Sequence, residues 1–176
     1  MICPSCGHAN LEGAEMCASC QNPLIDAESA RRANSVLEEK VAADAVSTLG
    51  PVRPIVAEPT TRVREVLRLL AEHNVGCVLV VFCDVLVGIF SERDLLMRVG
   101  DRLEELADHP IRHFMTPAPE TLGPDATVAF AINRMALCDF RHIPIEADER
   151  PVGVISVRDV LRYVGQQFPE ILAPTN

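Results

Sequence analysis

The sequence contains no uninterrupted apolar run approaching twenty residues, although apolar residues make up 48% of its 176 positions. A membrane-spanning helix needs about 20 such residues, so we expect no membrane span. The N-terminus also lacks the basic region followed by an apolar segment that marks a secretory signal. We therefore expect a cytoplasmic protein with one ordinary domain, or a compact domain and a small appendage.

Positive charge is also scarce. The chain has 16 Lys and Arg residues against 25 Asp and Glu residues, a net charge of −9. Lys40 is the single lysine, and no Lys or Arg lies between Met1 and Ala30. Nucleic-acid surfaces need clustered basic side chains. This charge distribution argues against nucleic acid as a partner and favours a protein contact for the N-terminal segment.

The N-terminal segment carries two C-x-x-C pairs, Cys3 with Cys6 and Cys17 with Cys20. Four thiolates from two tight turns form a closed tetrahedral site typical of structural zinc. Disulfides or idle thiols are the competing interpretation, but cytosolic thiols are kept reduced. The segment resembles a zinc ribbon, and we expect Zn²⁺ to supply its folding energy.

The rest of the chain contains a duplication. Residues 87–99 read VGIFSERDLLMRV and residues 152–164 read VGVISVRDVLRYV, with matching positions a constant distance apart (156 − 91 = 65). A repeated segment indicates a repeated structural unit. In each copy a β-branched run ends at a serine where a helical pattern begins.

Both copies predict the order β-α-β-β-α, and hence a mixed α/β (α+β) fold. In the first copy the expected elements are an extended piece at 54–57, a helix at 62–73, strands at 77–82 and 85–90, and a helix from Ser91. In the second copy they are an extended piece at 119–122, a helix at 127–138, strands at 142–146 and 151–155, and a helix at 156–167. A tight turn is expected at Cys83-Asp84.

An apolar stripe between Asp26 and Leu49 predicts one helix that ends at Gly50-Pro51. Between the copies, 101–115 reads as a helical connector interrupted by Pro110. The expected domains are a zinc ribbon (1–26), a helical linker (27–50), the first repeat (51–100), a connector (101–114), the second repeat (115–168) and a tail (169–176).

The Ser-x-x-Asp segments at Ser91 to Asp94 and Ser156 to Asp159 have two interpretations. The serine and the acid can cap the new helix, as in a capping box. Alternatively, the helix N-terminus, the hydroxyl and the carboxylate face a ligand that carries phosphate and ribose. From the four residues alone, capping is the commoner use.

A tandem β-α-β-β-α unit with these segments, with Met115-Thr116-Pro117 before its second copy and with Arg141-His142-Ile143-Pro144, resembles the CBS domain pair, or Bateman module. The resemblance covers residues 51–167. It implies two related clefts that hold adenosine compounds such as AMP, ADP, ATP or S-adenosylmethionine, and so favours the ligand interpretation.

The resemblance also implies the nucleotide-binding residues. Asp94 and Asp159 would accept ribose hydroxyls, and Ser91 and Ser156 would bind phosphate or ribose oxygen. The adenine pocket would be lined by Thr116, Pro117, Ala118, His142, Ile143 and Pro144, and phosphate could meet Arg141, Arg93 or Arg158; for Arg93 and Arg158 a purely surface role is equally open.

The two copies differ, because Gly76 and Cys77 stand where the second copy has Arg141 and His142. The first copy also has Gly50-Pro51-Val52 in place of Met-Thr-Pro. We therefore expect a competent site in the second copy and a weaker or adenosine-only site in the first.

The resemblance implies a noncatalytic regulatory protein that senses an adenine nucleotide, forms a homodimer and meets a protein partner through its zinc ribbon. The alternative is a transcription- or RNA-associated factor with a nucleic-acid-binding ribbon. An enzyme ranks last, because no paired carboxylates, triad or open metal site can be argued from the sequence.

Overall fold

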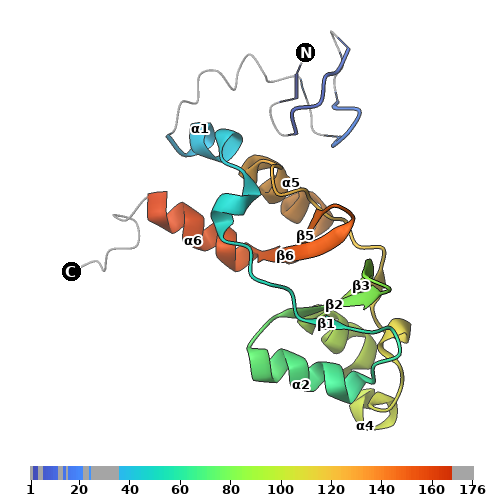
Figure 1. Cartoon of the computed structure of the whole chain (residues 1–176). Helices are drawn as coiled ribbons and strands as arrows, with labels where there is room; N and C mark the ends of the chain where they lie inside the picture. The colour runs from blue at the N-terminus through green and yellow to red at the C-terminus, as the bar shows by residue number, and fades with distance from the viewer. Residues whose placement is uncertain are drawn as a thin grey trace, which may run out of the picture. The chain divides into compact units, whose positions relative to one another are not determined.

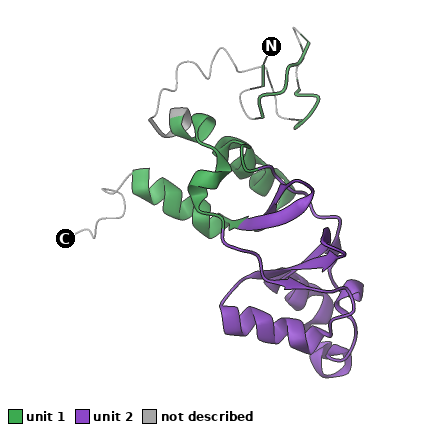
Figure 2. Ribbon diagram, viewed as in Figure 1, with its two compact units in different colours: residues 1–51, 124–141, 155–176 green, residues 52–123, 142–154 purple. Residues whose placement is uncertain are grey.

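The computed structural model describes residues 2–3, 6–11, 14, 16–21, 24 and 36–167. The chain divides into two compact units (Figure 2). Unit 1 comprises residues 1–51, 124–141 and 155–176, and unit 2 comprises residues 52–123 and 142–154. Segments from the second half of the chain therefore occur in both units. The expected tail (169–176) and residues 27–35 of the expected linker helix lie outside the described residues.

The first copy contains the expected order of elements, and the second contains it with an isolated bridge at Leu122 in place of the first strand (Figure 1). The first copy has β1 (Val56–Ala57), α2 (Val63–His73), β2 (Cys77–Phe82), β3 (Val85–Ser91) and α3 (Glu92–Asp94), which continues into the π-helical turn η3 (Leu95–Val99). The second copy has α5 (Val128–Cys138), β5 (His142–Ala147), β6 (Arg150–Ser156) and α6 (Val157–Gln167). The predicted mixed α/β class is confirmed.

The strand pairing repeats along with the sequence. Ala57 of β1 pairs in parallel with Val80 of β2, and Leu122 forms a parallel bridge with Ile145 of β5. Both pairs of positions are related by the offset of the sequence repeat (122 − 57 = 65 and 145 − 80 = 65). The duplication is therefore structural.

Two-residue turns join the hairpins of both copies. Cys83 and Asp84 have φ values of 51° and 65°, and Asp148 and Glu149 have φ values of 50° and 61°. Positive φ at both central residues matches the twist of the flanking strands in such tight hairpins. The expected turn at Cys83-Asp84 is confirmed.

The edges of the sheets are exchanged between the copies. Strand β4 (Thr116–Pro117) lies at the start of the second copy but pairs antiparallel with β3 of the first copy, so the four-stranded sheet has the order β1-β2-β3-β4. Val52 precedes β1 of the first copy but pairs with Val154 of β6, through N–H···O bonds of 3.1 and 3.0 Å. This exchange decides which segment lies beside each Ser-x-x-Asp motif.

The core of unit 2 follows the alternation of side chains along β2. On one face, Val78 and Val80 pack with Phe90 of β3 and with the apolar side of α2. On the other face, Cys77 and Leu79 pack with Ile89 and Val154. Strand β2 is buried on both faces, and on each face it packs with a residue of β3. This packing positions β3 and the helix that follows it.

The expected single helix up to Leu49 is wrong in its described part. It is interrupted between α1 (Val36–Ala43) and the 3₁₀ turn η2 (Val46–Leu49). The Val46 N–H donates to the Ala126 carbonyl at 2.7 Å, and the Asp44 carbonyl accepts from Val128 N–H at 2.8 Å. These tertiary bonds replace helical ones. Gly50, with φ 69°, ends η2 as predicted.

The connector between the copies is helical and interrupted at Pro110, as expected. It comprises η4 (Gly100–Arg102), α4 (Leu103–Leu106) and η5 (Ile111–His113). Within the part of the chain that the structure describes, no helix is long and apolar enough to cross a membrane.

Candidate functional site

The first Ser-x-x-Asp motif forms a capping box at the start of α3. Asp94 Oδ2 accepts from Ser91 N–H at 3.0 Å and from the Ser91 hydroxyl at 2.7 Å. Asp94 N–H donates back to Ser91 Oγ at 3.5 Å. The capping interpretation is therefore confirmed for this motif. Capping uses one carboxylate oxygen and leaves Oδ1 for other partners.

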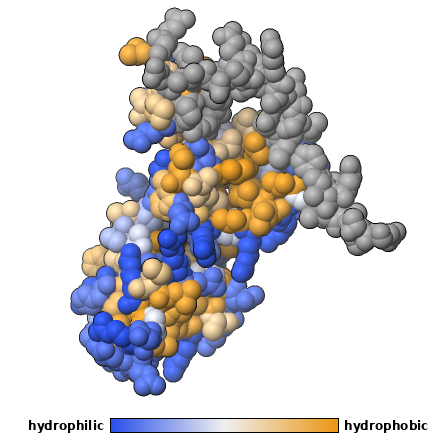
Figure 3. Space-filling model, turned by 180° about the vertical axis from the view of Figure 1, so that it is seen from behind, coloured by the Kyte–Doolittle hydropathy of each residue, from blue (hydrophilic) through white to orange (hydrophobic). Residues whose placement is uncertain are grey.

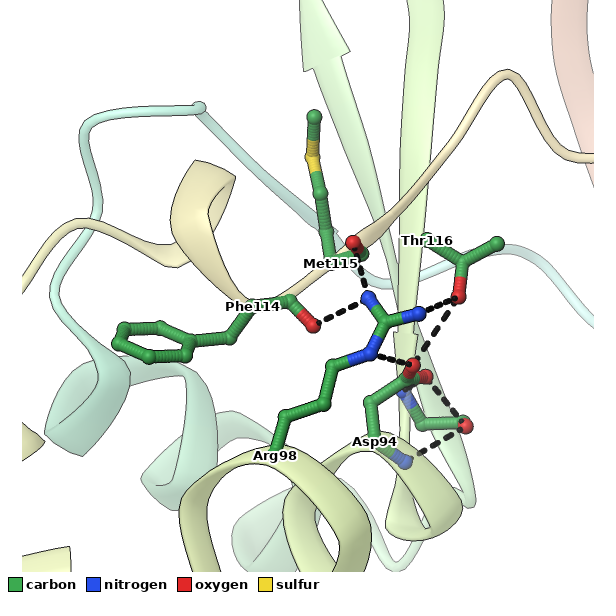
Figure 4. A network of polar contacts seen from close by, with 6 residues as sticks. Asp94, Arg98, Phe114, Met115 and Thr116 are labelled. Carbon is green, nitrogen blue, oxygen red and sulfur yellow. Dashed lines mark hydrogen bonds and ion pairs between the residues drawn. The ribbon is translucent and has the colours of Figure 1, made fainter.

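The second oxygen of Asp94 meets two further groups (Figure 4). Thr116 Oγ1 donates to Asp94 Oδ1 at 3.0 Å, and Arg98 Nε forms an ion pair with the same oxygen at 3.5 Å. The Asp94 residue is only 8% exposed. Burial of a charge is favourable only with such compensation, and Asp94 has it on both oxygens.

Arg98 extends this network to the backbone before β4. Its Nη1 donates to the Phe114 carbonyl at 2.9 Å and to the Met115 carbonyl, and its Nη2 donates to Thr116 Oγ1 at 3.2 Å. In Figure 4 the guanidinium lies between the Asp94 carboxylate and the 114–116 backbone. We call Ser91, Asp94, Arg98 and Thr116 the Asp94 site.

In the second motif the aspartate receives the same two bonds from its serine and has fewer other partners among the described residues. Asp159 Oδ2 accepts from Ser156 N–H at 2.8 Å and from the Ser156 hydroxyl at 2.7 Å. Asp159 Oδ1 accepts only from Arg162 Nη1, at 2.9 Å, among the described residues. Asp159 is 7% exposed, and with Asp94 it makes up the buried charged residues of the described part. We call Ser156, Asp159 and Arg162 the Asp159 site.

The repeat position of Arg98 holds Tyr163 in the second copy (163 − 98 = 65). The Tyr163 hydroxyl donates to Asp44 Oδ2 at 2.6 Å and so makes no bond to Asp159. Burial, reinforced by the hydrogen bond to Asp44 and its negative charge, raises the pKa of Tyr163 to about 12. The two sites therefore differ because Arg and Tyr occupy one equivalent position.

Thr116, Pro117 and Ala118, which were expected to line an adenine pocket, lie beside the first motif. Thr116 and Pro117 pair with Ile89 and Gly88 of β3, and Ala118 N–H donates to the Val87 carbonyl at 3.1 Å. The Thr116 side chain bonds to Asp94. The physical reason is the exchange of sheet edges, which places this segment beside the first motif.

The residues of the second copy that were expected to bind nucleotide differ in their exposure to solvent. The side chain of Arg141 is exposed, while its carbonyl accepts from Val157 N–H at 3.1 Å. Ile143 and Pro144 are buried, and the Pro144 carbonyl accepts from Leu122 N–H. His142 is half-buried in the strand that they share.

The His142 ring lies against Gly76 of the first copy. A Cβ added at Gly76 would lie 2.6 Å from His142 Nε2 and 3.5 Å from Glu92 Oε2. Gly76 stands at the repeat position of Arg141. Its lack of a side chain leaves room for the His142 imidazole.

Sequence reasoning named Arg93 and Arg158, which are both exposed. It missed Arg98 and Arg162, which contact the two buried aspartates. The missed signal was spacing, because side chains three or four residues apart lie on the same side of a helix.

The four N-terminal cysteines come together as predicted. Their sulfur atoms all lie within 4.8 Å of one another, with Cys3 to Cys20 and Cys6 to Cys17 each at 3.6 Å. Tetrahedral Zn–S bonds of about 2.3 Å place sulfurs about 3.8 Å apart. The donor set and its dimensions therefore fit a metal ion.

The thiol of Cys17 has a lowered pKa. Burial opposes the Cys17 thiolate, but the Cys20 and Ser19 N–H groups, with Asn10 and Cys6, stabilise it and lower its pKa to about 6. Thiolates are the form that binds metal.

Comparison with known proteins identifies the duplicated unit. A family model described as the CBS domain matches residues 46–101 and 111–166. An uncharacterised 17.7 kDa protein of Acidianus ambivalens is 30% identical over 119 residues, which cover 66% of this chain and 71% of that protein.

Solved structures share the fold. The CBS domain pair of protein MJ0100 matches with a TM-score of 0.63 and 23% identity, over 71% of this chain and 98% of its own. CBSX2 matches with a TM-score of 0.59 and 24% identity, over 70% of this chain and 97% of its own. The chain therefore belongs to the CBS domain family and carries two CBS domains in tandem.

Proposed function

We propose that this protein is a noncatalytic regulator that binds an adenosine compound through its CBS domains. The observation that carries the proposal is the pair of buried carboxylates, each held at the start of a helix by a serine through one oxygen. Two proteins of similar fold support it: MJ0100 was solved in complex with 5′-methylthioadenosine and S-adenosyl-L-methionine, and CBSX2 in complex with AMP.

The chemistry of the Asp159 site suits such a ligand. A carboxylate oxygen has two lone pairs, and Asp159 Oδ1 has one partner among the described residues, so it can accept a ribose hydroxyl. The N-terminus of α6 favours a phosphate, and Arg162 is a cation at the same place. Ser156, Arg158, Asp159 and Arg141 are the proposed ligand residues here.

The remaining expected ligand residues stay proposals. Around the Asp94 site they are Ser91, Arg93, Asp94, Thr116, Pro117 and Ala118. From strand β5 they are His142, Ile143 and Pro144.

Isothermal titration with AMP, ATP and S-adenosylmethionine tests the proposal. Loss of a hydrogen bond to a charged group costs about 1.5–3 kcal/mol, so Asp159→Asn should weaken binding about 10- to 100-fold. Asp148→Asn, in the exposed β5–β6 turn, is the matched control and should bind as the wild type does. Equal affinity in all three proteins would reject the assignment.

We further propose that ligand binding is relayed through a homodimer. Leu96 and Leu161 occupy the same repeat position (161 − 96 = 65) and are 73% and 64% exposed, and Met97 is 77% exposed. Figure 3 shows apolar patches set among hydrophilic side chains on the face in view. Exposed apolar side chains at repeated positions suit a contact between two molecules of this protein. Sedimentation velocity should show a dimer that Leu96→Asp with Leu161→Asp converts to monomer.

The N-terminal cysteines are proposed to hold a structural Zn²⁺, and the surface around them to meet a protein. Ile2 and Leu11 there are 71% and 85% exposed, and no Lys or Arg lies between Met1 and Ala30. An apolar surface without basic residues suits a protein partner better than a phosphate backbone. The ligand would then act by shifting the population of a packing or dimer state.

A further inference from the structure

We propose that Arg98 acts as an internal occupant of the Asp94 site and excludes ribose from it, so that each chain binds one adenosine ligand, at the Asp159 site. This inference rests on the proposed function, because it concerns which of the two repeated sites takes the ligand. It starts from the contacts of the two aspartates.

At the Asp94 site, the oxygen that would receive a ribose hydroxyl has no free position. Asp94 Oδ1 has two lone pairs and two partners, the Thr116 hydroxyl at 3.0 Å and Arg98 Nε at 3.5 Å. Oδ2 is used by both groups of Ser91. A ribose hydroxyl can reach this carboxylate only by displacing Thr116 or Arg98.

Arg98 is held in place by more than the carboxylate. Its other nitrogens donate to the carbonyls of Phe114 and Met115 and to Thr116 Oγ1. A guanidinium with a fixed fork of donors suits such a set of acceptors. Moving Arg98 would break all of these contacts together and leave a buried carboxylate without its cation.

Arg162 at the Asp159 site has no hydrogen bonds to backbone carbonyls like those of Arg98 among the described residues. Its contact with Asp159 is its only hydrogen bond or ion pair among the described residues, and its side chain is 61% exposed against 42% for Arg98. It can swing into solvent, or turn to a phosphate, without breaking other bonds. Tyr163, at the repeat position of Arg98, bonds to Asp44 instead of Asp159.

Binding stoichiometry tests the inference. We expect one AMP, ATP or S-adenosylmethionine per chain in the wild type, and the same binding weakened about 10- to 100-fold in Asp159→Asn. Adding Arg98→Met to Asp159→Asn should restore tighter binding at one site, and Asp94→Asn should weaken it again. Arg98→Gln, which keeps a neutral donor, repeats the test if Arg98→Met does not fold.

A second measurement, hydrogen exchange in the absence of ligand, tests whether Arg98 makes these contacts in solution. Hydrogen exchange at the Met115 and Ala118 amides should speed up at least tenfold in Arg98→Met or Arg98→Gln, and should be unchanged in Arg162→Met. Unchanged exchange in the Arg98 variants would overturn the inference.

The outcomes separate the two claims. A wild type that binds none of the three compounds contradicts the proposed function. A wild type that binds one equivalent at each of the two aspartates, or an Asp159→Asn/Arg98→Met protein that binds no more tightly than Asp159→Asn although the wild type binds, overturns the role of Arg98 alone.

Discussion

Tyr163 and Asp44 are joined by a 2.6 Å hydrogen bond in which the phenol donates to the carboxylate. This bond ties α6, which begins directly after the serine of the second Ser-x-x-Asp motif, to the residue that follows α1. Tyr163 is the only tyrosine of a chain without tryptophan. Its ultraviolet absorbance therefore reports on this one contact.

Burial and the contact with Asp44 should both raise the pKa of Tyr163. Titration of the tyrosinate absorbance should give a pKa of about 12 in the wild type, and a value nearer the ordinary 10 in Asp44→Asn. The folded pKa lies above the ordinary value, so the stability that the phenol contributes is complete below about pH 10 and is lost as the pH rises through 12. Identical titration curves would show that the bond is absent in solution.

Removal of the hydroxyl tests the same bond at neutral pH. Tyr163→Phe should lower the free energy of unfolding by about 1 kcal/mol at pH 7, the usual net value of such a bond. The difference from the wild type should shrink as the pH approaches 12. Urea unfolding at several pH values measures it, and a difference that grows with pH would contradict the account.

Gly76 should be intolerant of a side chain. A Cβ there meets His142 Nε2 at 2.6 Å, so Gly76→Ala must displace the ring and should cost about 1–3 kcal/mol. Gly123→Ala is the matched control, because a Cβ at Gly123 meets nothing within 4 Å, and it should change stability by less than about 0.5 kcal/mol. Equal urea midpoints for both variants would show that the ring does not depend on Gly76.

The sequence predicted most of the elements because a duplication gives each pattern twice. The strand at Cys77–Phe82 begins and ends as expected, and the hairpin turn at Cys83-Asp84 was identified from its flanking strands. The capping role of Ser91 was also readable, because it depends on residues three apart. Local patterns of this kind need no tertiary information.

The exchange of sheet edges was not predictable in the same way. Thr116 stands before the second copy, and only its pairing with Ile89 places it against Asp94. Such pairing depends on long-range backbone bonds that leave no period in the sequence. The interruption after Ala43 has the same origin, because the bond between Val46 and Ala126 is tertiary.

Metal content should depend on the four N-terminal cysteines and on no other. The wild type should carry about one zinc per chain, and Cys17→Ser should lose it together with the protease resistance of the segment, since a structural zinc supplies the folding energy of such short units. Cys83→Ser, in an exposed turn, is the control and should keep its zinc. Full metal content in Cys17→Ser, read by inductively coupled plasma mass spectrometry, would contradict the site.

The central claim is that this tandem CBS protein binds an adenosine compound. Native mass spectrometry of protein purified without denaturation, before and after addition of AMP, ATP or S-adenosylmethionine, tests it most directly. The account predicts a mass increase of one such compound per chain, which should need about 10- to 100-fold more ligand in Asp159→Asn and be unchanged in Asp148→Asn. No mass increase with any of the three compounds would contradict it.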